Sequence, residues 1–593
     1  MRGASLSASD GCGVEVSLTP VARVDGRWVS GPCRAVAAGV SCATDAGELE
    51  ASVVDGEVSV RLLASRDVTV EALGLDGAGR VPGADGWLSN GYQSWSQSGV
   101  VALGPFPADG AIDQALGRRG DAEVLRDGRD PSWTLTYVGG REHALFVGAT
   151  TSSRLKPWIA VGGVDGEVRL RAAAGGTGER VALRAGETLL GERFFVSTGL
   201  PFDQYAARLP SRRAAHPVAP PVGWNSWYEL WDSVDEAAVR DNARLAKAAL
   251  APVIPPGERP FVVVDDGWQR AWGDWRPSEA RFPSGLDGLA RDLDADGARL
   301  GVWLAPLLAS GESEVWAAHP DWFVPGLVYP HPKHGDMRVL DVTHPGAAAH
   351  LTAALEQLVA WGVSLVKIDF LFAGTWDGAR REGVTGAEAY ERALSLVRAA
   401  VGEQTLIVAV GAPPLPTLAY ADAWRVGPDI ALEGPSVSWT FVAHEARALA
   451  ARTPFCRATL CDADPPLLRR LSEDEVRAGA ALVGFAGGGL FLSDDLRKLD
   501  PSRLAWGLDP GVVAAATSGR VTAPDDVLFA SPPETLSNPV LDLVARSTSA
   551  RVPLVWTASS GARTAWNSSD DAVTAGGIDV PAHASRALPG APR

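Results

Sequence analysis

LVKIDFLFAG, from Leu365 to Gly374, has the apolar composition of a buried β-strand, yet Lys367 and Asp369 stand in its middle. Side chains two residues apart on a strand point to the same side, so the two charges share one space. Ionised groups in a protein interior are costly unless they are paired or put to use. The stretch is therefore either a core strand with a structural salt bridge or a strand that carries functional groups.

Short apolar runs alternate with helical segments around this stretch. We expect strands within residues 260–268, 298–306, 362–370, 405–413, 421–429 and 488–495. Helices are expected between them, and capping boxes of Ser233 with Glu236 and of Ser472 with Glu475 predict two helix starts. This alternation predicts a parallel (β/α)8 TIM barrel. An open doubly wound sheet is less favoured, because no glycine-rich phosphate loop follows a strand.

The segments on either side of this region have the pattern of all-β domains. Before it, short Val-rich runs alternate with Gly, Asp and Asn turns, which is typical of a β-sandwich. After it, the runs VLFASPP, PVLDLVARS, VPLVWTAS and RTAWNSS indicate a small β domain. We expect a β-sandwich (supersandwich) domain at residues 1–210, the barrel at residues 211–500 and a C-terminal β domain at residues 501–593.

Charge and cysteine content restrict the partners and the compartment. A formal net charge of −17 disfavours nucleic acid and anionic membranes as partners. No apolar run is long enough to span a bilayer, and the first residues do not have the pattern of a secretory signal. Five cysteines without a CxxC pair argue against a disulfide framework or a zinc site. We therefore expect a cytoplasmic protein that acts on a small molecule, and its assembly into a homo-oligomer is left open.

Polar side chains gather at the ends of the expected strands, where the active sites of barrels lie. These side chains are Asp265, Asp266, Trp303, Lys367, Asp369, Arg425 and Asp429. Hydrolysis of a glycosidic bond requires two carboxyl groups, one that protonates the leaving oxygen and one that attacks the sugar or activates water. Lys367 favours the ionised form of Asp369, as a nucleophile requires, whereas the residues alone leave the role of Asp429 open. The 21 tryptophans of the chain suit sugar rings as well as ordinary cores.

Six segments at suitable spacing carry a family resemblance. They are GWNSWYELWDSVDE, VVVDDGW, LGVWLAP, LVKIDFLFAG, GAPPLP and WRVGPDI. In this order they resemble the α-galactosidases of glycoside hydrolase family 36, the melibiase type. The resemblance covers the whole chain and implies the three-domain fold expected above. It also implies a retaining hydrolase that releases terminal α-linked galactose from oligosaccharides or other α-galactosides, with no metal or organic cofactor.

The resemblance implies roles for the matching charged residues. Asp369 is the expected nucleophile, and Asp429 is the expected acid/base. Lys367 and Arg425 are expected to contact sugar hydroxyls.

Five further residues are implied to bind the terminal sugar. The paired acids Asp265 and Asp266 are expected to hold its 4- and 6-hydroxyls. Trp227 and Trp303 are expected to line its pocket. Trp95, in the segment NGYQSWSQSG, is expected to reach the site from the N-terminal domain.

Several of these residues also have a structural interpretation. The alternatives are a plain ion pair for Lys367 with Asp369, helix capping for Asp265 and Asp266, pairing with Asp429 for Arg425, and sandwich core for Trp95. His319, His331, His334 and His344 would permit a metal site, but they lack the spacing of a metal-binding motif.

One departure from the family leaves the substrate open. Relatives carry a cysteine before the GAP segment, and Val410 stands there in this chain. That region shapes the pocket near the 2- and 4-positions of the sugar. A hydrolase for N-acetylgalactosamine is therefore kept as an alternative. A transglycosylase of the same family and a sugar-binding relative without activity are further alternatives. The last is disfavoured because both carboxylates are present.

Overall fold

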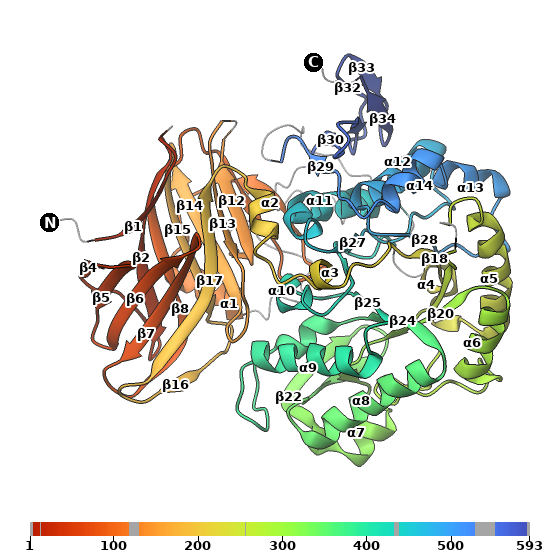
Figure 1. Cartoon of the computed structure of the whole chain (residues 1–593), viewed down its shortest axis with the longest axis horizontal. Coiled ribbons are helices and arrows are strands. Elements are labelled where there is room, and N and C mark those ends of the chain that lie inside the picture. Colours follow the sequence, from red (N-terminus) through yellow and green to blue (C-terminus); the bar gives the residue numbers. More distant parts are fainter. Residues whose placement is uncertain are drawn as a thin grey trace.

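The computed structural model of the chain describes residues 4–11, 13–117, 130–140, 142–254, 257–431, 438–527 and 552–589. An N-terminal β domain lies beside a central α/β domain, and a small β region lies at the C-terminal end (Figure 1). The multidomain fold expected from the sequence is confirmed. Every helix within these described ranges is too short or too polar to span a bilayer.

Two antiparallel sheets pack on a shared hydrophobic core in the N-terminal domain. In β7, alternate residues from Val58 to Ala64 are buried, as expected for a strand with one face on a core. The first sheet has the order β1 (Leu6–Ser9), β2 (Glu15–Val24), β8 (Val68–Arg80), β15 (Glu167–Gly175), β14 (Pro157–Val164) and β11 (Ser132–Trp133), with β3 (Arg27–Val29) on β2 and β16 (Val181–Leu183) on β8. The second has the order β10 (Gly99–Ala102), β9 (Gly86–Ser89), β12 (Leu135–Gly139), β13 (Ala144–Ala149), β17 (Thr188–Thr198), β7 (Glu57–Ala64), β6 (Gly47–Val54), β5 (Gly39–Ala43) and β4 (Cys33–Val36).

The central domain is a barrel of parallel strands. The strands are β18 (Val222–Asn225), β19 (Phe261–Val264), β20 (Arg299–Leu304), β24 (Val363–Ile368), β25 (Leu406–Ala409), β26 (Ala423–Arg425), β27 (Leu460–Asp462) and β28 (Leu490–Leu492). Each pairs with the next along the chain up to β27, and β28 pairs with β18. A parallel bridge between Cys461 and Gly487 connects β27 with the segment before β28, so the sheet curls toward closure. The strands are buried on both faces, which explains their continuous apolar sequences.

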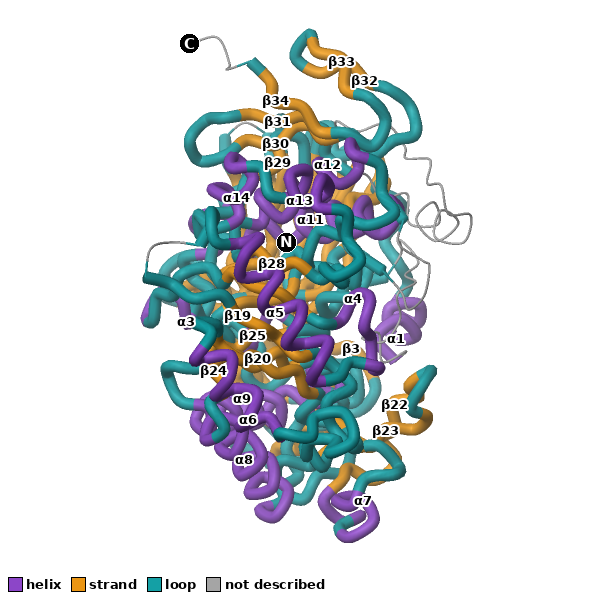
Figure 2. Tube along the Cα trace, turned by 90° about the vertical axis from the view of Figure 1, so that its right-hand side faces the viewer, coloured by secondary structure: helices purple, strands orange, loops and turns teal. Residues whose placement is uncertain are grey.

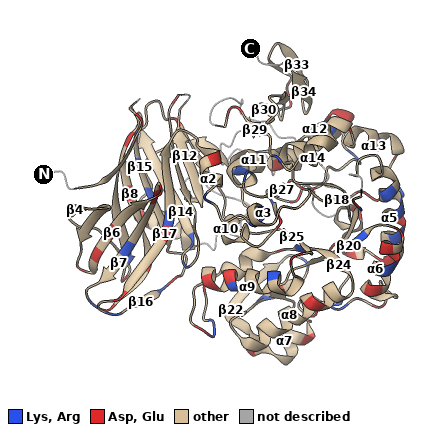
Figure 3. Ribbon diagram, in the orientation of Figure 1, with Lys and Arg blue, Asp and Glu red and all other residues tan. Residues whose placement is uncertain are grey.

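Helices connect successive strands of the barrel. They are α4 (Trp227–Leu230), α5 (Glu236–Leu250), α6 (Gly285–Ala295), α7 (Glu314–Ala318), α8 (Pro345–Ala360), α9 (Gly386–Val401), α10 (Pro414–Thr417), α11 (Trp439–Cys456) and α12 (Glu473–Ala486). Charged residues are dense along α5, α6 and α9 (Figure 3), which each bury one apolar face. A hairpin of β22 (Phe323–His331) and β23 (Gly335–Leu340), joined by β21 (Leu308–Ala309), is inserted between β20 and α8.

The outer segments add short elements to this core. Helices α1 (Asp109–Gly117), α2 (Phe202–Ala206) and α3 (Arg212–Ala215) belong to the part before the barrel. After it come α13 (Pro501–Gly507), α14 (Pro510–Ala516), β29 (Ala523–Pro524), β30 (Val555–Thr557), β31 (Arg563–Trp566), β32 (Val573–Ala575), β33 (Ile578–Val580) and β34 (Ser585–Leu588). The C-terminal strands lie over α12 (Figure 2), and the indole of Trp566 in β31 donates to the carbonyl of Ala478 in that helix at 2.9 Å. The indole of Trp566 stacks on Trp439 of α11, with ring centroids 5.0 Å apart.

The six predicted barrel strands are confirmed, and two short strands, β18 and β27, were missed. The capping box of Ser472 with Glu475 is confirmed at the start of α12. The one predicted for Ser233 with Glu236 is wrong, because Asp235 caps α5 by accepting the amide of Ala238. In the C-terminal part, VPLVWTAS and RTAWNSS contain strands, whereas PVLDLVARS and most of VLFASPP lie outside the described residues.

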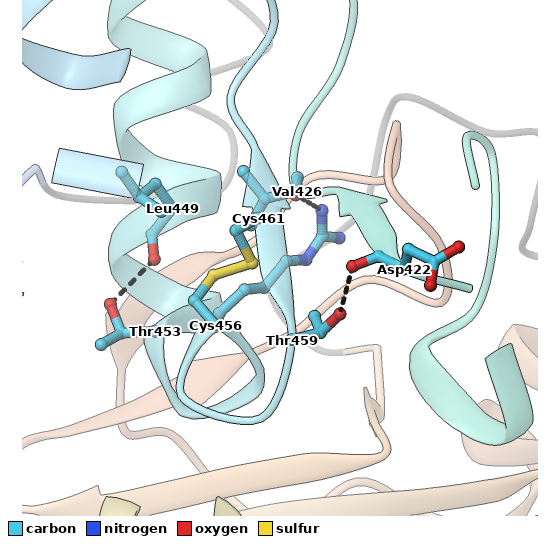
Figure 4. The surroundings of a disulfide bond; sticks show 8 residues. Asp422, Val426, Leu449, Thr453, Cys456, Thr459 and Cys461 are labelled. Atoms are coloured by element: carbon cyan, nitrogen blue, oxygen red, sulfur yellow. Dashed lines mark hydrogen bonds between the residues drawn. A yellow bond between two sulfur atoms is a disulfide. The ribbon is translucent and has the colours of Figure 1, made fainter. Parts of the chain in front are cut away.

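The expectation of a chain without disulfides is wrong. Cys33 and Cys42 are bonded across β4 and β5. Cys456, at the end of α11, is bonded to Cys461 on β27 (Figure 4). Spacing in the sequence did not indicate either pair, because neither has a CxxC pattern. Disulfides persist mainly in oxidising environments, so the expectation of a cytoplasmic protein loses its basis.

A buried ion pair ties the N-terminal domain to the barrel. Lys156, directly before β14 in the N-terminal domain, donates to the carboxylate of Asp377 at 2.7 Å and to the carbonyl of Thr375 at 2.9 Å. Both acceptors follow β24 in the barrel. Lys156 also lies 3.8 Å from Glu179 of its own domain. The contact fixes the N-terminal domain beside the loop that follows LVKIDF.

Replacing Lys156 by Met should lower the free energy of unfolding by about 3–5 kcal/mol, because two buried carboxylates lose their cation. Denaturant unfolding measures this loss. Arg291→Met is the matched control: it removes an exposed pair with Asp287 and should cost less than about 1 kcal/mol. Equal stability of the two variants would show that the Lys156 contact does not hold the domains together.

Candidate active site

The carboxyl ends of neighbouring barrel strands bring the predicted residues to one mouth. Asp265 and Asp266 follow β19, Asp369 follows β24, and Arg425 ends β26. Trp303 lies on β20, between the strands that carry the acids. In parallel strands of one barrel these ends share one edge, which is where barrel sites are built.

Lys367 is paired with Asp265 rather than with its neighbour Asp369. Its ammonium donates to Asp265 Oδ2 at 2.7 Å. Asn225, at the end of β18, donates to the same oxygen at 2.7 Å. Burial lowers the pKa of Lys367, but Asp265 and the other nearby acids outweigh it, so the net pKa is raised. Lys367 therefore stays charged inside the barrel.

Asp369 is buried and held by two donors. Trp303 Nε1 donates to Oδ2 at 3.0 Å, and the amide of Phe370 donates to Oδ1 at 2.7 Å. Burial raises its pKa to about 7, with Asp429 adding to the rise and Lys367, Trp303 and Phe370 opposing it. Phe370 has the left-handed backbone (φ 55°), as does Gly411 beside it (φ 55°). A Cβ at Gly411 would lie 3.3 Å from Asp369 Oδ1, so glycine leaves room for the carboxylate there.

Arg425 gathers three carboxyl groups. Its Nε donates to Asp462 at 2.8 Å, Nη2 lies 2.6 Å from Asp464, and Nη1 lies 3.4 Å from Asp429. The Arg425 side chain is buried, whereas that of Asp429 keeps 34% of its surface exposed. Asp429 is therefore anchored on one side and open to the mouth on the other. The pairing of Arg425 with Asp429, its structural alternative, is thus present in the molecule. A contact of Arg425 with a sugar hydroxyl remains a prediction.

Four polar residues of the site were missed by sequence reasoning: Asn225, Tyr228, Asp462 and Asp464. The Tyr228 hydroxyl donates to Asp464, and the amide of Ile430 donates to the same carboxylate at 3.1 Å. Burial raises the pKa of Asp464 to about 7, and Arg425 opposes the rise. β27 has only three residues, too few for a periodic pattern. The spacing of Asp462 and Asp464 in CDAD, two residues apart, was the signal available.

The β22–β23 hairpin covers one side of the mouth. Asp266 accepts from Gln269 at 2.5 Å and from Trp272 at 3.0 Å, and His334 of the hairpin lies 3.5 Å from its other oxygen. His331 packs beside His334, and burial lowers its pKa to about 4.

The two remaining predicted histidines lie apart from the mouth. His319 stacks on Trp322, and His344 caps α8. Within the described residues, no group of three or more His, Cys, Asp or Glu side chains has the geometry of a metal site.

The predicted tryptophans differ in their surroundings. Trp303 is buried against Trp272, while Trp227 is part-exposed and packs edge-on against Trp231. Trp95 belongs to the N-terminal domain but packs edge-on against Phe370 of the barrel, with ring centroids 4.7 Å apart. Its indole Nε1 is buried and has no hydrogen-bond partner among the described residues. The N-terminal domain thus places an aromatic ring against Phe370, the residue that follows Asp369.

The floor of the mouth contains a cavity of about 30 Å³. This volume has room for water, because one water needs roughly 10–15 Å³. The cavity is lined by Asn225, Val263, Leu365, Lys367, Val408, Arg425, Asp462, Asp464, Pro465 and Phe491.

Comparison with known proteins agrees with this arrangement. Residues 220–393 match the family model described as Melibiase. α-Galactosidase AgaA of Geobacillus stearothermophilus is 29% identical over 163 residues, which are 26% of this chain and 21% of that protein. A probable α-galactosidase G of Emericella nidulans is 29% identical over 167 residues, 25% of this chain and 22% of that protein. The aligned segment thus spans only about a fifth of these relatives.

Solved structures extend the likeness to most of the chain. The α-galactosidase TtGalA of Thermus thermophilus, 25% identical, covers 79% of this chain and 94% of its own, with a TM-score of 0.55. The family 36 α-galactosidase AgaA, 14% identical, covers 98% of this chain and 86% of its own, with a TM-score of 0.59. The second likeness concerns the fold alone. The chain therefore matches the melibiase model over residues 220–393 and is similar in fold to the family 36 α-galactosidases.

Proposed function

We propose that this protein is a glycoside hydrolase that releases terminal, non-reducing α-linked galactose by a retaining double displacement. The observation that carries the proposal is Asp369, a buried carboxylate held by Trp303 and Phe370 while Asp429 shares its mouth. The relative TtGalA has been solved with p-nitrophenyl α-D-galactopyranoside and with stachyose, so we infer that the substrates are small α-galactosides.

The two carboxyl groups divide the work. Asp369 attacks the anomeric carbon and forms a glycosyl ester, while the acid form of Asp429 protonates the leaving oxygen. Asp429 then takes a proton from water, which attacks the ester and returns the sugar with its original configuration. The part-exposed position of Asp429 suits a group that exchanges protons with water and leaving group. The proposed reaction therefore uses only these two carboxyl groups and one water molecule.

The pair Asp265–Lys367 and Asp266 support recognition of galactose. Carboxylates beside an axial 4-hydroxyl accept charge-assisted hydrogen bonds that an equatorial hydroxyl would not reproduce. Asn225 and Lys367 hold Asp265, and Gln269 holds Asp266, so both acceptors are fixed before the sugar arrives. Trp95, Trp227 and Trp303 supply apolar faces around the ring, and Trp95 also offers a buried N–H donor that has no partner among the described residues.

Asp369→Ala should lose at least about a thousandfold in kcat on aryl α-galactosides, because the variant has no nucleophile. Wild type should cleave the α-galactoside in preference to the α-N-acetylgalactosaminide, α-glucoside and β-L-arabinopyranoside. Azide should restore part of the activity and give β-galactosyl azide with Asp369→Ala, but α-galactosyl azide with Asp429→Ala.

The exposed Asp579→Ala is the control for these substitutions and should match wild type. An Asp369→Ala protein that retains wild-type activity would refute the assignment of the nucleophile.

The acid limb of kcat/KM should lie near pH 7, because free Asp369 must lose a proton before it attacks and its pKa is raised to about 7. Below that pH the rate should fall about tenfold per pH unit. Asp464, whose pKa is also raised, is the competing source of the limb. The variant Asp464→Asn should keep the acid limb of kcat/KM. If the limb is absent in this variant, it belongs to Asp464 instead.

The stability of Asp369→Asn should show the same pKa without any substrate. Folded Asp369 binds its proton more tightly than unfolded Asp, so the stability of wild type falls as pH rises from about 4 to about 7. Asparagine removes this loss. The variant should therefore gain on the order of a few kcal/mol relative to wild type between pH 4 and pH 8. Chemical denaturation at both pH values measures the gain, and an equal difference at both would exclude a raised pKa.

A further inference from the structure

One arginine links the loop of Trp95 to the segment that carries Asp429. Arg452 lies near the end of α11, is 1% exposed and makes hydrogen bonds to two domains. Its donors reach Asn90 Oδ1 at 3.1 Å, Ser94 O at 2.6 Å, Gln93 O at 2.7 Å, Ser96 O at 2.9 Å and Val426 O. Four of these acceptors belong to the N-terminal domain and one to the barrel.

The N-terminal acceptors form the turn that presents Trp95. Carbonyls on both sides of Trp95, from Ser94 and Ser96, accept from the same guanidinium. Inside the turn, the amide of Trp95 donates to Gln93 Oε1 at 2.8 Å. Ser94 also accepts from the amide of Ala412 in the segment after β25, at 3.4 Å. Residues of the barrel domain therefore hold the turn in place. Arg452 donates four of the hydrogen bonds that do so, and Ala412 donates another.

The barrel acceptor, Val426, lies between Arg425 and Asp429. Its amide donates to the carbonyl of Asp462 at 2.9 Å while its carbonyl accepts from Arg452. Both backbone polar groups of Val426 are therefore hydrogen-bonded, three residues before the proposed acid/base.

Helix α11 touches the Asp429 segment at a second point. Glu445, seven residues before Arg452 and on the same face of the helix, is fully buried, and neither of its carboxyl oxygens has a hydrogen-bond partner among the residues that the structure describes. A Cβ at Gly427 would lie 1.8 Å from Glu445 Oε2, so a larger residue there would displace the Glu445 carboxyl group. The disulfide from Cys456 anchors the end of this helix to β27 (Figure 4). The helix is thus fixed to the strand that holds Asp462.

We propose that Arg452 is a positioning residue that fixes Trp95 and Asp429 relative to each other across the domain boundary. The kinetic consequence of this inference rests on the proposed function, whereas its consequence for the structure of the two segments does not. A buried guanidinium with five acceptors cannot be replaced by water without leaving carbonyls unpaired. Loss of Arg452 should release the Trp95 turn and the 426–429 segment together.

The kinetic consequence depends on the leaving group. A displaced Asp429 protonates the leaving oxygen poorly, which slows an alkyl α-galactoside much more than a dinitrophenyl one, whose leaving group needs no acid. A misplacement of about 1 Å can cost about a hundredfold. A merely destabilised protein would lose the same fraction of activity on both substrates.

The test combines exchange and kinetics on full-length Arg452→Met and the milder Arg452→Lys. Hydrogen–deuterium exchange, read by mass spectrometry, should be faster in residues 91–98 and 427–430 than in wild type. The ratio of kcat/KM between dinitrophenyl and methyl α-galactosides should rise at least tenfold. If Arg452→Met does not fold, Arg452→Lys carries both measurements, since lysine cannot reach all the acceptors at once.

Arg398→Met is the matched control. Arg398, on α9, is also buried and donates to carbonyls of Gly402, Thr405 and Tyr420, but at the opposite end of the barrel strands. Its loss should lower stability without changing exchange at 91–98 or the leaving-group ratio.

Unchanged exchange in both segments would overturn the positioning role, as would a ratio equal to wild type with folded protein. A wild type that cleaves no α-galactoside would instead refute the proposed function, and the exchange result would still decide the role of Arg452.

Discussion

Two buried cations, Lys367 and Arg425, hold the mouth of the barrel together. Around them lie the aspartates of four strand ends: Asp265, Asp266, Asp369, Asp429, Asp462 and Asp464. Lys367 takes Asp265 and Arg425 takes three others, so each cation is paired and each pair is fixed by further donors. Carboxyl groups outnumber the cations, and burial disfavours their charge. Burial is the main cause of the raised pKa values of Asp369 and Asp464, and the charge of Asp429 adds to both.

The site is a product of two domains rather than of the barrel alone. The barrel supplies the acids and cations, and the N-terminal domain supplies Trp95 beside Phe370. Lys156 and Arg452 stabilise this arrangement. Lys156 of the N-terminal domain donates to a loop of the barrel, and Arg452 of the barrel domain donates to the turn of the N-terminal domain that carries Trp95. Under the proposed function, the ring and the acids must contact the same small sugar, so the domain boundary has to be rigid.

The sequence was sufficient for the barrel and for the residues at its long strands, because buried parallel strands are continuous apolar runs and their polar ends are conspicuous. The sequence was insufficient for strands that are too short to show a hydrophobic pattern. β27 has three residues, so Asp462 and Asp464 went unnoticed. The partner of Lys367 was also out of reach, since Asp265 is 102 positions away and only the fold brings it close. The disulfides depended in the same way on strand and helix placement. Trp95 was expected at the site through the family resemblance, and its place against Phe370 was visible only in the structure.

The central claim is that Asp369 forms a covalent bond to the sugar. A fluorinated galactosyl fluoride that slows hydrolysis of the glycosyl ester should trap this intermediate on the intact protein, and peptide mapping by mass spectrometry locates the bond. The account predicts a single galactosyl label on Asp369 in the peptide that contains LVKIDF, absent from Asp369→Asn. A label on another carboxylate, or an unlabelled enzyme that releases the sugar with inverted configuration, would contradict it.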